Sequence, residues 1–364
     1  MNEPSENQSA LSSSTSSGEV SSLNPNLDLH SKSGRQKTTP IAEYVKGIRN
    51  RDRVVLSKAI TLLESTRAQH QEKARAILDR LLPETGNSIR VAITGVPGVG
   101  KSTFIESLGT RLVEDGHRLA VLTIDPSSER SKGSILGDKT RMGALASRDD
   151  VYVRPSPTAG TLGGVARKTR ETIFLCEAAG FDVVLVETVG VGQSEVKVRS
   201  MVDFFLLLAL AGAGDELQGI KRGIVEMSDA IAINKADGEN RAAAEDARAE
   251  YEKALHLLGE PASDWQPPVL TCSGQTGEGI DEVWNVVTEF QRQMQASGFF
   301  RTQRRRQARH WLYQTIEQRL RDDFFSNPDV KATRDEIEAA VLDGTLSSFA
   351  AAEALLDTYR QSVE

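Results

Sequence analysis

Several features that define large classes of proteins are scarce or missing in this sequence of 364 residues. Its two cysteines, Cys176 and Cys272, stand far apart and form no CxxC pair, so we expect reduced thiols rather than a disulfide framework. The longest apolar run, FFLLLALA at 204–211, is far shorter than the ~20 residues of a membrane-spanning helix. The formal net charge of −7 gives no overall indication of nucleic acid or an anionic membrane as a partner. We therefore expect neither.

The N-terminal segment lacks the features of targeting peptides. It has no apolar core of the secretory type, and its first arginine is Arg35, which disfavours a mitochondrial transit peptide. We therefore expect a cytoplasmic location. Residues 1–40 are rich in serine and poor in bulky apolar side chains, so they cannot bury enough surface to offset the entropy of ordering; we predict a disordered tail.

Beyond the tail, the chain divides by pattern into three regions. Residues 41–87 have helical spacing, with Asp52 as a plausible N-cap of one helix and Pro83 with Gly86 ending another. Residues 88–294 alternate between aliphatic strands and helices. After about residue 295 the strands disappear, and residues 295–364 are predicted to be helical. No internal repeat is found.

The central region predicts the fold class. Six aliphatic runs read as strands: SIRVAITG, RLAVLTID, FDVVLVE, FFLLLALA, DAIAINKAD and PPVLTCSG. Helical segments separate most of them, and this indicates an α/β fold with a mainly parallel sheet covered by helices on both faces. In such sheets ligands bind at the carboxyl ends of the strands.

The first of these strands leads into a phosphate-binding loop. The residues Gly95, Val96, Pro97, Gly98, Val99, Gly100, Lys101 and Ser102 satisfy the pattern GxxxxGK[ST], and Thr103 follows in the next helix. The glycines let the backbone wrap a phosphate with its N–H groups turned inward at a helix N-terminus. Lys101 is expected to reach the β- and γ-phosphates, and the Ser102 hydroxyl to bind Mg²⁺. This motif predicts a nucleoside triphosphate ligand.

A second motif, NKAD at 234–237, indicates which base is bound. It directly follows an aliphatic strand. The carboxylate of Asp237 can accept hydrogen bonds from N1–H and the exocyclic amine of guanine, whereas adenine presents a lone pair at N1, and such a polar mismatch is costly. Asn234 and the aliphatic part of Lys235 are expected to support the loop and the base. The motif favours GTP over ATP, with GDP as the product.

The loop after the last predicted strand, TCSGQTG at 271–277, is a weaker candidate. Backbone amides of Ser273, Gly274 and Gln275 could contact the guanine O6. A plain glycine-rich turn explains the same residues about equally well without the preceding NKAD motif.

Acidic residues at strand ends are candidates for the metal and the switch. Mg²⁺ prefers oxygen ligands and retains several waters, so one or two carboxylates suffice. Besides Ser102, the candidate ligands are Asp125, Asp138 and Glu187, although an aspartate in this position is often only a cap or turn residue. Glu187 is the best supported, because glycines follow it closely and Gly190 could present its amide to the γ-phosphate. Lys101, Glu187 and Gly190 are therefore the candidates for catalysis.

Two further stretches leave alternatives open. The segment DELQGIKRGIVE could be a solvated helix or a mobile segment that reports the nucleotide state. The arginines of the C-terminal region favour a solvated or interface surface over nucleic acid, since no aromatic residues are interleaved; they are Arg301, Arg304, Arg305, Arg306 and Arg309. In that region apolar residues recur every four positions, which predicts a long helix whose apolar stripe should be covered. The stripe consists of Ala308, Leu312, Ile316, Leu320 and Phe324.

Taken together, the motifs resemble those of a known family. GVPGVGKST, IDPSS, GSILGDKTRM, ETVGVGQSE, GAGDELQGIKRGI and NKAD occur in the order seen in the MeaB/ArgK family of P-loop GTPases. ETVGVGQSE and GAGDELQGIK are specific to that family. The resemblance runs from about Ile41 to the C-terminus.

The resemblance carries several expectations. It implies the SIMIBI-type branch of P-loop GTPases, Mg²⁺ surrounded by Ser102, Asp125, Asp138 and Glu187, and a third switch in DELQGIKRGI. It also implies a homodimer with the C-terminal helices as its arm. The implied function is that of a chaperone for an adenosylcobalamin-dependent acyl-CoA mutase, typically methylmalonyl-CoA mutase. Rival interpretations are a kinase linked to basic amino-acid transport and a metal-insertion GTPase, although the five histidines are scattered rather than clustered.

Overall fold

A computed structural model describes residues 39–124, 142–156, 162–188, 194–212, 222–257 and 263–363. The chain divides into two units, Met1–Thr39 and Pro40–Glu364, and the description below concerns the second. Apart from its last residues, the serine-rich tail lies outside the described residues. No helix in the described ranges combines the length and the apolar character needed to cross a membrane.

Three helices open the second unit: α1 (Ile41–Arg49), α2 (Arg53–Glu64) and α3 (Ala68–Leu81), followed by the short 3₁₀ helix η1 (Leu82–Glu84). The predicted cap of α2 is present, since the Asp52 carboxylate accepts hydrogen bonds from the backbone N–H groups of Val54 and Val55. The helix α1 had not been predicted as a separate element.

In the described ranges, seven parallel strands form one sheet in the order β3-β2-β4-β1-β5-β6-β7. They are β1 (Ile89–Thr94), β2 (Leu119–Ile124), β3 (Val151–Ser156), β4 (Val183–Thr188), β5 (Phe204–Leu210), β6 (Ala230–Asn234) and β7 (Val269–Thr271). The predicted α/β class with a parallel sheet is therefore confirmed. Six of the strands coincide with the six aliphatic runs.

The sequence patterns missed strand β3. It is an edge strand that pairs only with β2 among the described residues. Its sequence, VYVRPS, contains Arg154 and Pro155 and so lacks the continuous aliphatic character of a strand in the middle of a parallel sheet. Proline has no N–H to donate and is tolerated at the edge of a sheet. The edge position explains why this strand could depart from the pattern.

Helices cover both faces of the sheet. The helices are α4 (Lys101–Glu114), α6 (Gly143–Ala146), α7 (Leu162–Ala178), α8 (Ser194–Arg199), α10 (Arg222–Met227), η3 (Gly238–Asn240), α11 (Arg241–His256) and α12 (Ile280–Ala296). Successive strand residues point to opposite faces, so Ala92 and Val184 pack with α1–α3 and α7, whereas Val91 and Leu185 pack with α4 and α12. The N-terminal helices thus share the main core. A third cluster joins β5 and β6 to α11.

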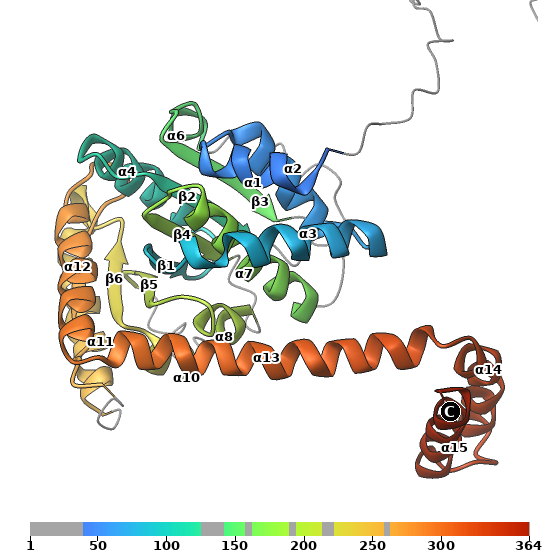
Figure 1. Cartoon of the computed structure of the whole chain (residues 1–364). Coiled ribbons are helices and arrows are strands. Elements are labelled where there is room, and N and C mark those ends of the chain that lie inside the picture. Colours follow the sequence, from blue (N-terminus) through green and yellow to red (C-terminus); the bar gives the residue numbers. More distant parts are fainter. Residues whose placement is uncertain are drawn as a thin grey trace, which may run out of the picture. The chain divides into compact units, whose positions relative to one another are not determined.

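The C-terminal region consists of α13 (Phe299–Ser326), α14 (Pro328–Leu342) and α15 (Ser348–Val363). Figure 1 shows α13 as a long helix that starts next to α12 and carries α14 and α15 at its other end. The predicted long helix is present. Its apolar stripe stays exposed in the single chain: Leu312 is 58% exposed, Ile316 44% and Leu320 61%. The divisions proposed at residues 87 and 294 fall inside the second unit and stay predictions.

Candidate functional site

The phosphate-binding loop lies between β1 and α4, at the carboxyl edge of the sheet. Three of its glycines, Gly95, Gly98 and Gly100, have positive φ angles of 149°, 82° and 95°. A side chain on Gly95 would collide with the backbone carbonyl of Leu208 in β5, and one on Gly100 would come within 2.8 Å of the Asn234 amide. The glycines are therefore needed for both the turn and the close approach of neighbouring elements.

Lys101 begins α4 and turns back over the loop. Its ammonium group donates hydrogen bonds to the backbone carbonyls of Gly95, at 2.7 Å, and Val96, at 3.1 Å. The side chain is nearly buried, and burial lowers the pKa of Lys101, while the carboxylates of Glu187 and Glu195 act to raise it. A phosphate is charged and therefore a stronger hydrogen-bond acceptor than a neutral carbonyl. A buried ammonium group held only by carbonyls can exchange them for a phosphate.

Glu187 reaches the same loop from the end of β4. The Ser102 hydroxyl donates a hydrogen bond to Glu187 Oε1 at 3.1 Å, and Glu187 is only 6% exposed. Beside it, the Thr188 hydroxyl donates to the Thr94 hydroxyl at 2.8 Å. The structure thus brings two of the predicted metal ligands together. A carboxylate and a hydroxyl oxygen beside a phosphate loop are the donor chemistry that Mg²⁺ prefers, so these residues fit the ion.

Other predicted site residues lie outside the described residues: Asp125, Asp138 and Gly190. Their assignment stays a prediction. Within the ranges that the structure describes, no group of three or more His, Cys, Asp and Glu residues is arranged as a metal site.

Asn234 connects the phosphate loop to the loop after β7. Its amide nitrogen donates to the carbonyl of Val99 at 2.8 Å, and its amide oxygen accepts from the backbone N–H of Gly274 at 3.0 Å. It is almost fully buried at the end of β6. A side chain with both a donor and an acceptor is required for this bridge. These contacts lie within the protein, and the predicted support of a bound base by Asn234 stays a prediction.

Asp237 is held by a residue of the last loop. The Ser273 hydroxyl donates to Asp237 Oδ2 at 2.5 Å and itself accepts from the N–H of Thr276. Ser273 is fully buried, whereas Asp237 is half-buried. The hydroxyl therefore fixes the carboxylate while the other oxygen can still face a base. Lys235 precedes it with a positive φ of 61°, an uncommon conformation that directs its exposed side chain beside Gly100.

Two of the backbone amides predicted to contact guanine donate hydrogen bonds within the protein instead. The N–H of Ser273 donates to the carbonyl of Glu278, and the N–H of Gly274 donates to Asn234. Both amides are thus engaged within the protein. Gln275 is exposed, and its contact with guanine O6 stays a prediction.

Sequence reasoning missed two residues of this region. Glu195, in the first turn of α8, is 1% exposed and acts on the charge of Lys101. Thr123 lies opposite Glu187 in the strand register and has a buried hydroxyl with no hydrogen-bond partner among the described residues. The ETVGVGQSE motif contained Glu195, but only the fold shows that it is buried and close enough to Lys101 to influence its charge.

Comparisons with known proteins agree with this geometry. Residues 56–329 match the family model described as "Methylmalonyl Co-A mutase-associated GTPase MeaB". A Mycobacterium tuberculosis protein named as a GTPase is 53% identical over 85% of this chain and 92% of its own length. The mouse methylmalonic aciduria type A homolog, described as mitochondrial, is 47% identical over 86% and 78% of the two chains. A solved structure titled LAO/AO transport system kinase is 38% identical, with a TM-score of 0.69 over 88% and 97%.

Proposed function

Because the chain belongs to the MeaB family of P-loop GTPases, we propose that its GTP hydrolysis serves an adenosylcobalamin-dependent acyl-CoA mutase, namely methylmalonyl-CoA mutase. In this role the GTPase gates the loading of intact cofactor onto the mutase and the release of damaged cofactor. The observation that carries the proposal is the family match across residues 56–329, which includes every described residue of the nucleotide site.

The described residues support binding and orientation of the triphosphate. Lys101 would exchange its contacts with the loop carbonyls for the β- and γ-phosphates. Ser102 and Glu187, with Asp125 and Asp138 as predicted additions, would hold Mg²⁺, which supplies neutralisation of phosphate charge. Asp237, fixed by Ser273, would accept from guanine. GTP is cleaved to GDP and phosphate.

The described side chains around the loop support a low intrinsic rate. In the part of the site that the structure describes, the only carboxylates that act on Lys101 are Glu187 and Glu195, and Glu187 is already bound to Ser102. Glu195 is 1% exposed and Glu187 accepts from Ser102, so neither carboxylate of the described residues is offered to solvent as a general base. Phosphoryl transfer needs groups that stabilise the phosphate charge and a group that positions the attacking water. A site that has the first but lacks the second can obtain it from a partner protein. This supports a turnover that rises when the mutase binds.

We also propose a cytoplasmic homodimer formed through the C-terminal helices. The exposed stripe of α13, formed by Leu312, Ile316 and Leu320, is the surface to be covered.

The test of the mutase proposal is GTP turnover of the purified full chain as a function of mutase concentration. We expect kcat to rise with saturation as methylmalonyl-CoA mutase of the source organism is added. The variant Lys101→Ala, with the same mutase, is the control for contaminating GTPases. Turnover that stays flat with every adenosylcobalamin-dependent mutase of that organism would sink the proposal.

The name of the 38% identical solved structure raises the kinase alternative. A kinase would transfer the γ-phosphate to a protein acceptor instead of water. Incubation with γ-labelled GTP and candidate acceptors separates the two activities, because a kinase labels the acceptor and a GTPase releases all label as free phosphate. We expect free phosphate.

A further inference from the structure

The short helix α8 links the nucleotide site to the C-terminal arm. It packs against β4, the strand that carries Glu187 near its end, and its first turn contains the buried Glu195. The helix has six residues, so its axis is about 9 Å long at 1.5 Å per residue. The residues that follow its C-terminal end contact α13 of the C-terminal arm.

The segment that follows α8, residues 200–203, has backbone carbonyls that accept hydrogen bonds from side chains of α13. The Gln307 amide donates to the carbonyl of Val202 at 2.7 Å, and Trp311 Nε1 donates to the carbonyl of Ser200 at 3.0 Å. Gln303 donates to the carbonyl of Asp203 at 3.3 Å. These three donors recur every four residues along α13 and thus share one face of that helix.

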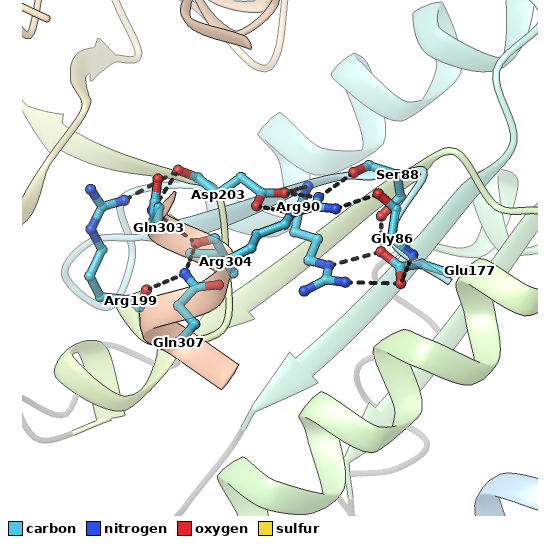
Figure 2. Close-up of polar contacts among 10 residues, drawn as sticks. Gly86, Ser88, Arg90, Glu177, Arg199, Asp203, Gln303, Arg304 and Gln307 are labelled. Atoms are coloured by element: carbon cyan, nitrogen blue, oxygen red, sulfur yellow. Dashed lines mark hydrogen bonds and ion pairs between the residues drawn. The ribbon is translucent and has the colours of Figure 1, made fainter. Parts of the chain in front are cut away.

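An ion pair fixes the same segment from its side chain. Arg304 makes two hydrogen bonds to the Asp203 carboxylate, at 2.8 and 2.6 Å, and also donates to the carbonyl of Ser88. Asp203 is 1% exposed. Figure 2 shows Gln303, Arg304 and Gln307 projecting from α13 toward the connector that ends in Asp203. Buried bidentate contacts of this kind define position as well as contribute energy.

Apolar packing joins α13 to the same segment. Trp311 is 4% exposed and belongs to the same core cluster as Val198 and Val202 of the α8 region. The segment that follows the expected γ-phosphate loop is thus held by side-chain donors, an ion pair and apolar contact, all from the first half of α13. Movement at α8 requires α13 to move with it or to release these contacts.

We propose that Gln303, Arg304, Gln307 and Trp311 form a clamp on residues 199–203 that positions α8 and couples the GTPase site to the C-terminal arm. The inference rests on the proposed GTPase function, since it assigns these residues as positioning residues for GTP turnover. In the clamp, the amide, indole and guanidinium groups of α13 donate hydrogen bonds to backbone carbonyls and to the Asp203 carboxylate. Through these contacts, a difference in the position of α8 between the GTP and GDP states would be transmitted to α13.

The kinetic test uses Gln307→Leu in the full chain, with Gln314→Leu as the matched control. Gln314 lies on the same helix but is exposed and bonded only to Glu317 in the described structure. We expect Gln307→Leu to lower kcat for GTP by about five-fold or more, the lower end of typical coupling between sites, with GDP affinity within about two-fold of wild type. Gln314→Leu should match wild type in both. An unchanged kcat in Gln307→Leu would overturn the clamp, as would equal losses of GDP affinity and kcat.

A second test does not depend on the folding of a kinetic variant. Trp311 is one of three tryptophans, so its contribution to the emission is obtained by comparing the wild-type chain with single tryptophan variants. We expect emission of the wild-type chain to differ between GDP and a non-hydrolysable GTP analogue. Trp311→Phe, which keeps an aromatic side chain but removes the reporting indole and its N–H donor, should abolish that difference, and Trp284→Phe on α12 should preserve it. A difference that survives Trp311→Phe, or no difference at all, would contradict the proposal.

The tests need no mutase, so the two proposals can fail separately. If the mutase leaves turnover flat but the Trp311 signal follows the nucleotide, the partner proposal fails and the clamp stands. If the mutase stimulates turnover and the Trp311 signal does not respond, the clamp fails and the partner proposal stands.

Discussion

Polar residues lie at both ends of the parallel sheet, but they differ in the strength of their hydrogen-bond and ion-pair partners. At the carboxyl end, Lys101 rests on backbone carbonyls and Glu187 accepts from a serine hydroxyl, which are contacts that a phosphate or a metal ion can replace. At the amino end, arginines and carboxylates that are mostly buried form bidentate pairs, so each charge already has a strong partner within the protein. Those pairs are Arg90–Glu177, Arg304–Asp203 and Arg199–Asp229.

The strength of these partners distinguishes a ligand-binding site from a structural ion-pair network when both contain buried charges. Glu177 also accepts from the Ser88 hydroxyl and the N–H of Gly86, so its oxygens are fully used (Figure 2). Such a network holds distant parts of the chain together, here β1, α7 and α13. The site at the other end keeps one strong cation without a strong partner. Substitutions at the amino end should therefore affect stability first, and those at the carboxyl end should affect nucleotide chemistry first.

The largest effect is expected from Asp203→Ala. The change leaves the Arg304 guanidinium buried without its carboxylate, and breaking a buried pair costs about 3–5 kcal/mol of unfolding free energy. Urea denaturation of the nucleotide-free chain measures it. The control is Glu289→Ala, which removes a carboxylate of an exposed pair with Arg292 and should leave the urea midpoint unchanged. Equal midpoints for Asp203→Ala and the control would erase the contrast between the two ends.

Lys101→Ala is expected to act on turnover instead. Removing the cation that binds the γ-phosphate should lower kcat for GTP hydrolysis by about 100-fold or more, as loss of one electrostatic donor does in other enzymes. Unfolding free energy without nucleotide should not fall, because burial already disfavours the charged form of Lys101. Phosphate release and urea denaturation are measured on the same preparation. Retained turnover would mean that the phosphate loop is misassigned.

Asp237→Asn should change which base is preferred. An asparagine cannot accept from both guanine nitrogens as a carboxylate does, and a hydrogen bond to a charged group contributes about 1.5–3 kcal/mol. GTP affinity should fall roughly 10- to 100-fold, while ATP affinity changes little. Competition against a fluorescent GDP analogue gives both values. Equal losses for the two nucleotides would contradict the assigned role of Asp237.

Acid should weaken the amino end through Glu177. Burial raises the pKa of Glu177, but Arg90, Ser88 and the N–H of Gly86 outweigh it, so the pKa lies below its usual range. A carboxyl whose folded pKa is lowered stabilises the fold above its unfolded pKa of about 4.3, and this stabilisation is lost as the pH falls through the folded value.

The test of this pH dependence compares wild type with Glu177→Gln by urea denaturation between pH 7 and pH 3. The difference in unfolding free energy should be largest near neutral pH and shrink as the pH is lowered. It should be smaller than the effect of Asp203→Ala, because the glutamine side chain can still accept from Ser88 or Gly86. A difference that grows toward low pH would reverse the assigned sign.

Much of the carboxyl end could be predicted because its chemistry is contiguous in sequence. The loop from Gly95 to Ser102 and the motif at 234–237 each require particular residues at fixed spacing, and the structure places them together. Sequence reasoning did not identify that Ser273 fixes Asp237 through its hydroxyl, because the two are 36 residues apart and neither motif requires the contact. Strand β3 was missed for a similar reason, since an edge strand need not be aliphatic.

Local patterns therefore determined the class of fold, the nucleotide loop and the base motif, since each depends on periodicity or on spacing within a few residues. Only the tertiary structure decided the partners of buried charges. Arg304 stood in a run of arginines that favoured a solvated or interface surface, yet it is paired with Asp203, 101 residues away. The physical reason is that a buried charge takes whichever partner the packing of distant elements brings within hydrogen-bond reach, and no local pattern specifies that partner.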